Sequence, residues 1–184
     1  MERADASTPL NLMSRISIVH VAAAIRKVRA MDMPQRVALA EEISKTQPNM
    51  LASCLVQTRL GLEASAVDIL LNILLVCYQA MKESGYQWPV ISEQEQERYL
   101  KRHIGAVLFS EQMTDPAASE QARSQYLSSH PEQPLLAYVI TETNHWLADV
   151  ARRSAEAESD KYLMMASVNL VNCIAYADAQ SKAV

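Results

Sequence analysis

Residues 63–84, with the sequence EASAVDILLNILLVCYQAMKES, decide the fold. When this stretch is projected as a helix, its polar side chains fall in one narrow sector that Val76 interrupts, and every other direction is apolar. That sector holds Ser65, Asp68, Asn72, Gln79 and Glu83. A helix that is apolar on nearly all sides is buried by its neighbours or spans a membrane. The apolar run between Asp68 and Gln79 is too short for a bilayer, so we expect the central helix of a soluble helical domain, with no membrane contact.

Seven further helices are expected around this central one. Most begin at a proline suited to a first helical turn or at a capping residue, such as Ser92 with Glu95 or Ser129 with Glu132. They span residues 10–31, 34–46, 48–59, 92–113, 116–128, 131–153 and 159–180. Residues 1–9 are expected to form a disordered lead-in, and residues 86–91 a rigid loop. The sequence therefore predicts an all-α fold, a single-domain bundle of about eight helices over residues 10–184 around residues 63–84.

The composition agrees with this fold class and excludes several functions. Hydrophobic residues make up 49% of the chain, which is typical of a globular protein. There are only three glycines, so neither a dinucleotide-binding glycine motif nor a P-loop is possible. The three cysteines are far apart in apolar segments, which predicts buried free thiols rather than disulfides or a zinc site. The amino-terminal residues lack the pattern of a secretory signal, so we expect a cytoplasmic protein.

The net charge of −4 is unevenly distributed along the chain. Residues 1–60 carry eight basic against five acidic side chains, whereas residues 61–184 carry nine against sixteen. Four of the basic side chains, Arg26, Lys27, Arg29 and Arg36, cluster where the first expected helix meets the second. The two short helices that follow have the lengths of a helix-turn-helix, but the second starts with a mostly apolar segment where base-reading side chains would be needed. Binding of nucleic acid through residues 26–36 is therefore an unlikely function, and a solvated basic patch is the simpler interpretation.

One face of the expected helix 131–153 has a pattern that could bind a metal or a ligand. Glu142, His145, Asp149 and Arg153 share this face, with Tyr138 beside them. Glu-x-x-His is the half-site of helical di-iron proteins, but such a site needs a second copy, and no other histidine has a glutamate three residues before it. The simpler interpretation is a solvated polar face with an Asp149–Arg153 pair. The sequence predicts no metal and no cofactor.

A second pair of candidate residues lies on the expected helix 92–113. Tyr99 and His103 are four residues apart, with Lys101 and Arg102 between them. A catalytic histidine needs a nucleophile and an orienting group, and no serine or cysteine stands in a nucleophile motif. We therefore interpret His103 as a histidine at the margin of the core, and we assign no catalytic residue.

Four polar side chains interrupt the two most apolar segments. They are Asp68, Asn72, Asn169 and Asn172. Because buried polar groups need partners, these residues could bond each other across a helix pair, line a ligand pocket, or lie at an exposed edge. We consider pairing or exposure the more common outcome.

Strong fold signals without catalytic motifs favour a non-catalytic protein that acts through protein–protein contacts. Two nearly all-apolar helices, together with Tyr86, Trp88 and Trp146, could exceed what one core can hide, and excess apolar surface marks a partner or a homodimer interface. A small acidic helical chain would also suit an immunity or antitoxin protein of bacterial type, because such proteins often mask basic enzymes. The alternative is a ligand-binding or metal-binding protein, or an enzyme, that uses the face of Glu142, His145 and Asp149.

Overall fold

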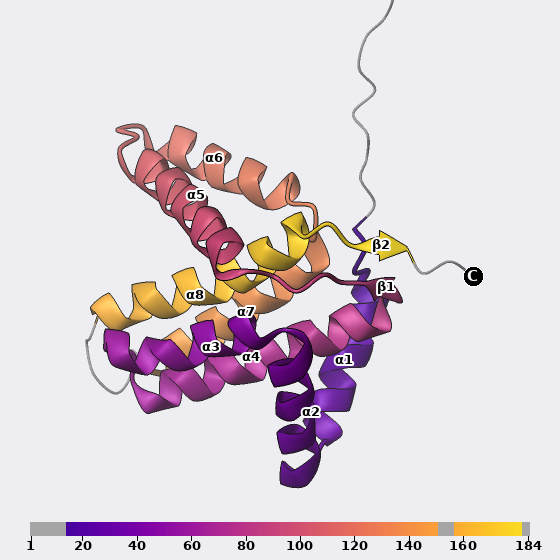
Figure 1. The fold of residues 1–184 in the computed structure, drawn as a ribbon. Helices are drawn as coiled ribbons and strands as arrows, with labels where there is room; N and C mark the ends of the chain where they lie inside the picture. Colours follow the sequence, from indigo (N-terminus) through magenta and orange to yellow (C-terminus); the bar gives the residue numbers. More distant parts are fainter. Residues whose placement is uncertain (1–13, 151–156, 182–184) are drawn as a thin grey trace, which may run out of the picture.

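The expected all-α bundle is confirmed. A computed structural model describes residues 14–150 and 157–181, which form eight α-helices, and Figure 1 shows how they are arranged. The helices are α1 (Ile18–Ala30), α2 (Met33–Thr46), α3 (Pro48–Leu55), α4 (Ala64–Glu83), α5 (Glu93–Glu111), α6 (Pro116–Ser128), α7 (Gln133–Val150) and α8 (Ala157–Tyr176). A 3₁₀ helix, η1 (Val56–Leu60), follows α3, and two short strands, β1 (Tyr86–Gln87) and β2 (Gln180–Ser181), pair with each other.

Helix α4 lies at the centre of the bundle, as residues 63–84 predict. It contacts α1, α2, α3, α7 and α8, and eleven of its side chains are buried, among them Leu70, Ile73 and Cys77. Each fully buried leucine or isoleucine contributes roughly 1.5–3 kcal/mol. By length and composition α4 could also cross a membrane, but 61% of its apolar window is buried inside the protein. The apolar surface of α4 is therefore used to form the protein core.

The first helix starts later than the sequence suggests. It begins at Ile18 rather than at residue 10, because Ser17 forms a capping box with His20. The Ser17 hydroxyl accepts the His20 N–H at 3.4 Å, and His20 Nδ1 accepts the Ser17 N–H at 3.2 Å. Residues 14–17 are not helical, and the earlier part of the expected helix lies outside the described residues, as does the expected lead-in at 1–9.

Two other boundaries differ from expectation. The helix expected at 48–59 is divided into α3 and η1, and Gly61, with φ of 95°, ends it. The last helix stops at Tyr176 rather than at residue 180, because the following residues pair with the segment after α4. Tyr86 lies opposite Ser181 in this antiparallel pairing, so the expected loop at 86–91 begins as a strand. A pairing between residues so far apart in sequence leaves no local signal.

A buried ion pair between Arg15 and Glu132 joins the amino-terminal segment to the start of α7. Glu132 is fully buried, and its carboxylate accepts hydrogen bonds from the Arg15 Nε at 3.0 Å, the Ile16 N–H at 3.0 Å and the Ser14 hydroxyl. The expected capping box of Ser129 with Glu132 is wrong, because the Glu132 side chain points to the amino-terminal segment instead. This carboxylate is therefore a structural anchor rather than a helix cap.

The same arginine also holds the end of α8. Its two terminal nitrogens donate to three backbone carbonyls at 2.7–2.8 Å, those of Ile174, Ala175 and Ala177. These carbonyls lie at the end of α8, where the regular helical hydrogen bonds stop and where a cation is stabilised by the helix dipole. The guanidinium also lies 4.8 Å from the centroid of the Trp88 ring. One side chain thus joins four segments of the chain.

We expect Arg15→Met to lower the free energy of unfolding by about 3–5 kcal/mol, because it leaves a buried carboxylate without its cation. Adding Glu132→Gln to this variant should restore part of the loss, since the unpaired charge is removed. Lys27→Met is the control. It breaks the ion pair between Lys27 Nζ and Glu83 Oε1, which are 2.5 Å apart. Because the lysine side chain is 56% exposed, the free energy of unfolding should fall by about 1 kcal/mol or less. Urea denaturation measures all three, and equal losses for Arg15→Met and Lys27→Met would contradict the role of the pair.

Candidate functional site

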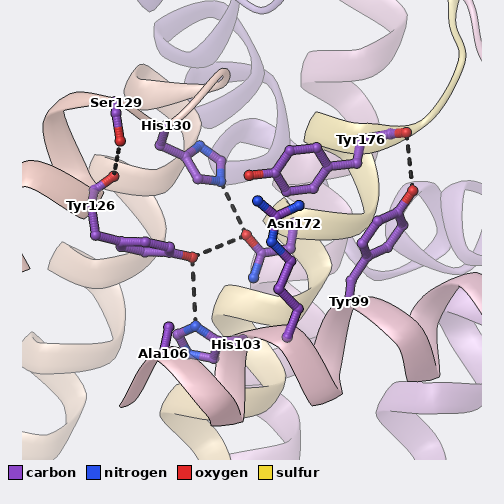
Figure 2. Close-up of a pocket in the computed structure, with 9 residues that line it drawn as sticks. Tyr99, His103, Ala106, Tyr126, Ser129, His130, Asn172 and Tyr176 are labelled. Carbon is purple, nitrogen blue, oxygen red and sulfur yellow. Dashed lines mark hydrogen bonds between the residues drawn. The ribbon is translucent and has the colours of Figure 1, made fainter. Parts of the chain in front are cut away.

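A cavity lies where the hairpin formed by α5 and α6 meets α8. Its volume is about 210 Å³. Figure 2 shows the side chains around it, which come from α5, from the end of α6 and the turn after it, and from α8. The cavity is lined by Tyr99, Arg102, His103, Ala106, Tyr126, Ser129, His130, Asn172 and Tyr176. We call it the His–Tyr cavity.

Helical spacing brings these residues to the cavity from each side. On α5, Tyr99, His103 and Ala106 follow one another at intervals of four and three residues, so they share a face. A capping box of Ser92 with Glu95 fixes the start of α5. On α8, Asn172 and Tyr176 are four residues apart and also share a face. The cavity thus forms where two helix faces meet and the end of α6 covers them.

The Asn172 side chain is the centre of the hydrogen-bond network. Its Oδ1 accepts from the Tyr126 hydroxyl at 3.1 Å and pairs with His130 Nε2 at 3.1 Å (Figure 2). His130 Nδ1 accepts the backbone N–H of Glu132 at 3.1 Å, so in the neutral ring the proton must be on Nε2. The Nε2–H of His130 needs an acceptor, so the oxygen of the Asn172 amide, and not its nitrogen, must face His130.

His103 completes the network from α5. Its Nδ1 lies 3.5 Å from the Tyr126 hydroxyl oxygen. Because the hydroxyl has one proton and donates it to Asn172, the His103 ring contributes its own Nδ1–H to this contact. The three ring side chains and the amide are therefore ordered by one another, and the network joins α5, α6, the turn before α7, and α8.

Burial keeps both histidines neutral near pH 7. Loss of solvation lowers the pKa of His103, and the nearby His130 lowers it further. Loss of solvation also lowers the pKa of His130, against smaller opposing effects of Asn172 and Glu132. Burial raises the pKa of Tyr126, so its hydroxyl is also neutral. No carboxylate lines the cavity, and its charge comes from Arg102.

The Arg102 guanidinium lies 5.0 Å from the centroid of the Tyr176 ring, a cation–π contact. Among residues 14–150 and 157–181 it forms no ion pair. Tyr176 is itself held by Tyr99, whose ring stacks on it at 5.3 Å and whose hydroxyl donates to its backbone carbonyl at 3.1 Å. The cavity therefore presents an unpaired cation on a fixed aromatic wall.

The chemistry available in the cavity favours binding over catalysis. A covalent mechanism needs an activated nucleophile next to a base. The Ser129 hydroxyl instead donates to the backbone carbonyl of Tyr126 at 3.4 Å. All three cysteines are free and buried, as predicted, and burial raises the pKa of Cys54 and of Cys173 to about 12, far from the thiolate range.

The structure places the predicted polar face of α7 away from this cavity. His145 is exposed, and Glu142 accepts an ion pair from Arg29 at 3.4 Å. Asp149 is half-buried, and Arg153 lies outside the described residues. No group of three or more His, Cys, Asp or Glu side chains suited to a metal occurs in the described part of the chain. The use of this face to bind a ligand therefore stays a prediction from sequence.

Tyr86 and Trp88, the other two predicted binding candidates, belong to the structural scaffold. Tyr86 lies in β1, and its ring centroid is 6.3 Å from that of Trp88. The Trp88 Nε1–H donates to the Met81 carbonyl at 3.1 Å, and its ring receives Arg15. Trp88 thus connects the loop after α4 to the core, and Tyr86 contacts Trp88.

Of the alternatives considered for the four polar residues of the apolar helices, pairing with one another does not occur. Asp68 is exposed, and Asn72 accepts from Arg36 Nη1 at 3.1 Å. Asn169 donates to the Gln96 carbonyl at 3.2 Å, and Asn172 lines the cavity. The pocket alternative therefore holds for Asn172, and Tyr99 and His103, taken from sequence as core-margin residues, line the same pocket.

Three of the four side chains in the basic cluster at 26–36 contact other residues of the protein. Lys27 pairs with Glu83, Arg29 pairs with Glu142, and Arg36 donates to Asn72 and to the Val28 carbonyl. These contacts reduce the charge that a nucleic acid would meet at this surface.

No family model, no curated protein and no solved structure matches this chain. The geometry of the described residues is therefore the basis for the functional proposals that follow.

We expect the two cavity histidines to titrate below their usual pKa of about 6.5 and to make the protein less stable in mild acid. Because the unfolded chain binds protons more readily than the buried rings, the free energy of unfolding is highest above about pH 6.5 and falls as the pH drops toward the folded-state pKa values. NMR titration of the imidazoles and urea denaturation between about pH 8 and pH 5.5 measure both effects.

His103→Leu is the control for this prediction, since it removes one of the two contributions. The variant should show a weaker loss of stability over the same pH range. Imidazole midpoints at or above the usual value would contradict the prediction.

Proposed function

We propose that this protein binds a small molecule in the His–Tyr cavity without chemically changing it. The observation that supports the proposal is a preformed cavity of about 210 Å³ that is lined by aromatic rings and a few ordered polar groups. Binding sites for small molecules are typically concave, aromatic-rich and largely preformed, with a small number of polar groups that fix orientation.

Several of these polar groups are free to contact a ligand. The Asn172 amide nitrogen and the Tyr176 hydroxyl make no hydrogen bond with any residue in 14–150 or 157–181, and Arg102 has no ion-pair partner there. The Asn172 amide oxygen already accepts two hydrogen bonds, one from Tyr126 and one from His130. The cavity therefore combines a rigid hydrogen-bonded wall with donors that a ligand can use.

Filling the cavity should abolish binding. Ala106→Trp places a large side chain at an exposed lining position, so the fold should tolerate it. Lys101→Trp adds the same ring at an exposed position on α5 that does not line the cavity. Ligand-observed NMR with a panel of water-soluble monocyclic compounds should show binding to the unmodified protein and to Lys101→Trp, but not to Ala106→Trp. Loss of binding in both variants, or in neither, would contradict the proposal.

We propose, as a second candidate function, that the protein associates with a protein partner or with a second copy of itself. The supporting observation is the exposed apolar surface of the α5–α6 hairpin, which projects from the bundle (Figure 1). Leu108, Phe109 and Leu127 are 50%, 65% and 42% exposed. Exposed apolar side chains on a surface mark interaction sites, and an immunity or antitoxin protein would use such a surface together with its negative charge.

Self-association through this surface is tested by light scattering at several concentrations. The average mass of the unmodified protein should rise with concentration, whereas Leu108→Ser combined with Phe109→Ser should remain monomeric, because the apolar contact is lost. The control is Leu55→Ser combined with Leu60→Ser, an equally polar change at exposed sites on α3 and η1. A monomer at all concentrations would rule out the homodimer.

A further inference from the structure

The His–Tyr cavity has an excess of hydrogen-bond donors. Its groups that are free for a ligand are the guanidinium of Arg102, the amide nitrogen of Asn172 and the hydroxyl of Tyr176, and no carboxylate lines it. The His103 Nε2 and the Tyr176 hydroxyl can accept, but the guanidinium and the amide nitrogen can only donate, and these two groups favour a ligand that brings acceptor oxygens. A guanidinium is the side chain best matched to a carboxylate or phosphate, because its N–H groups form two parallel hydrogen bonds.

The charge of the cavity limits the charge of the ligand. Arg102 is its one guanidinium or ammonium group, and both lining histidines are neutral near pH 7. A single fixed cation balances a single negative charge, whereas a phosphate dianion would leave an uncompensated charge in a partly buried site. The cavity therefore suits a monoanion.

The aromatic walls point to a ring in the ligand. Five rings follow one another around the cavity, in the order His103, Tyr126, His130, Tyr176 and Tyr99, with successive centroids 5.3–6.2 Å apart. Aromatic side chains at such distances favour contact with another ring over an aliphatic group of the same size. An apolar cavity of about 150 Å³ admits benzene. The 210 Å³ of this cavity leaves room for one ring and one small substituent.

We propose that the His–Tyr cavity binds a monocyclic aromatic carboxylate, with the carboxylate at Arg102 and Asn172 and the ring against Tyr126 and Tyr176. This assignment rests on the proposed function of the cavity and names the class of ligand for it. The guanidinium neutralises the carboxylate, the Asn172 amide donates to one of its oxygens, and the aromatic side chains surround the ring.

Isothermal titration calorimetry with simple probes tests the assignment. The probes are benzoate, its uncharged analogue benzamide, cyclohexanecarboxylate and inorganic phosphate. Because a hydrogen bond to a charged group is stronger than a neutral one, benzoate should bind at least about tenfold more tightly than benzamide. Cyclohexanecarboxylate should bind more weakly than benzoate, and phosphate should not compete with it.

Two variants on α5 separate the role of Arg102 from a change in net charge. Arg102→Gln should reduce the preference for benzoate over benzamide to about threefold or less. Lys101→Gln removes the same charge from a neighbouring exposed residue outside the cavity and should keep the preference.

The outcomes distinguish this inference from the function on which it rests. Equal binding of benzoate and benzamide, or an unchanged preference in Arg102→Gln, would overturn the aromatic carboxylate while leaving a ligand cavity in place. Competition by phosphate that is tighter than benzoate would overturn it in the same way. If no compound in the panel of monocyclic compounds binds, whether charged or neutral, the proposed function is overturned as well.

Discussion

The buried ion pair of Arg15 and Glu132 holds the amino-terminal segment against the start of α7 and the end of α8. Taking two charges out of water is costly, and the cost is offset only where further hydrogen bonds satisfy both partners. Glu132 accepts three hydrogen bonds from the amino-terminal segment, and Arg15 donates to three carbonyls at the end of α8 in addition to Glu132. Both charges are therefore well compensated, and the pair stabilises one arrangement of the amino-terminal segment, α7 and α8.

The two residues of the pair also contact residues that line the cavity. The backbone N–H of Glu132 fixes the tautomer of His130, which in turn fixes the Asn172 amide. The carbonyls that Arg15 holds flank Tyr176, which forms the opposite wall. The Glu132 backbone thus orders the His130 wall, and the Arg15 side chain holds the backbone on both sides of Tyr176.

The helices could be predicted from sequence because their signals are local. The apolar periodicity of residues 63–84 placed α4, the capping box of Ser92 with Glu95 placed the start of α5, and Asp115 before Pro116 placed the start of α6. The errors occur where distant segments meet. Glu132 resembled part of a capping box, but its side chain binds Ser14, Arg15 and Ile16, which lie more than a hundred residues earlier in the chain. Helix α8 ends earlier than expected because Ser181 pairs with Tyr86. Local sequence contains no information on such partners.

The site was only partly predictable for the same reason. Tyr99 and His103 stood out on one helix and Asn172 stood out as a polar residue in an apolar segment, but the sequence did not show that they meet. Tyr126 and His130, which join them, are ordinary in their own segments. The face of Glu142 and His145 had the stronger local pattern, yet the described residues bring no further ligands to it. Convergence of side chains from several helices, rather than spacing within one, distinguishes the cavity.

The position of the cavity connects the two proposed functions. Helix α5 buries only Gln96, Tyr99 and His103 among its described side chains, and α6 buries none. The α5–α6 hairpin therefore rests on the core largely through the polar and aromatic residues around the cavity, and not through a continuous apolar interface. A molecule bound there, as proposed, would contact both the hairpin and α8 and would stabilise the attachment of the hairpin. The exposed Leu108 and Phe109 lie on that same hairpin, so occupancy of the cavity and presentation of the apolar surface depend on one set of contacts.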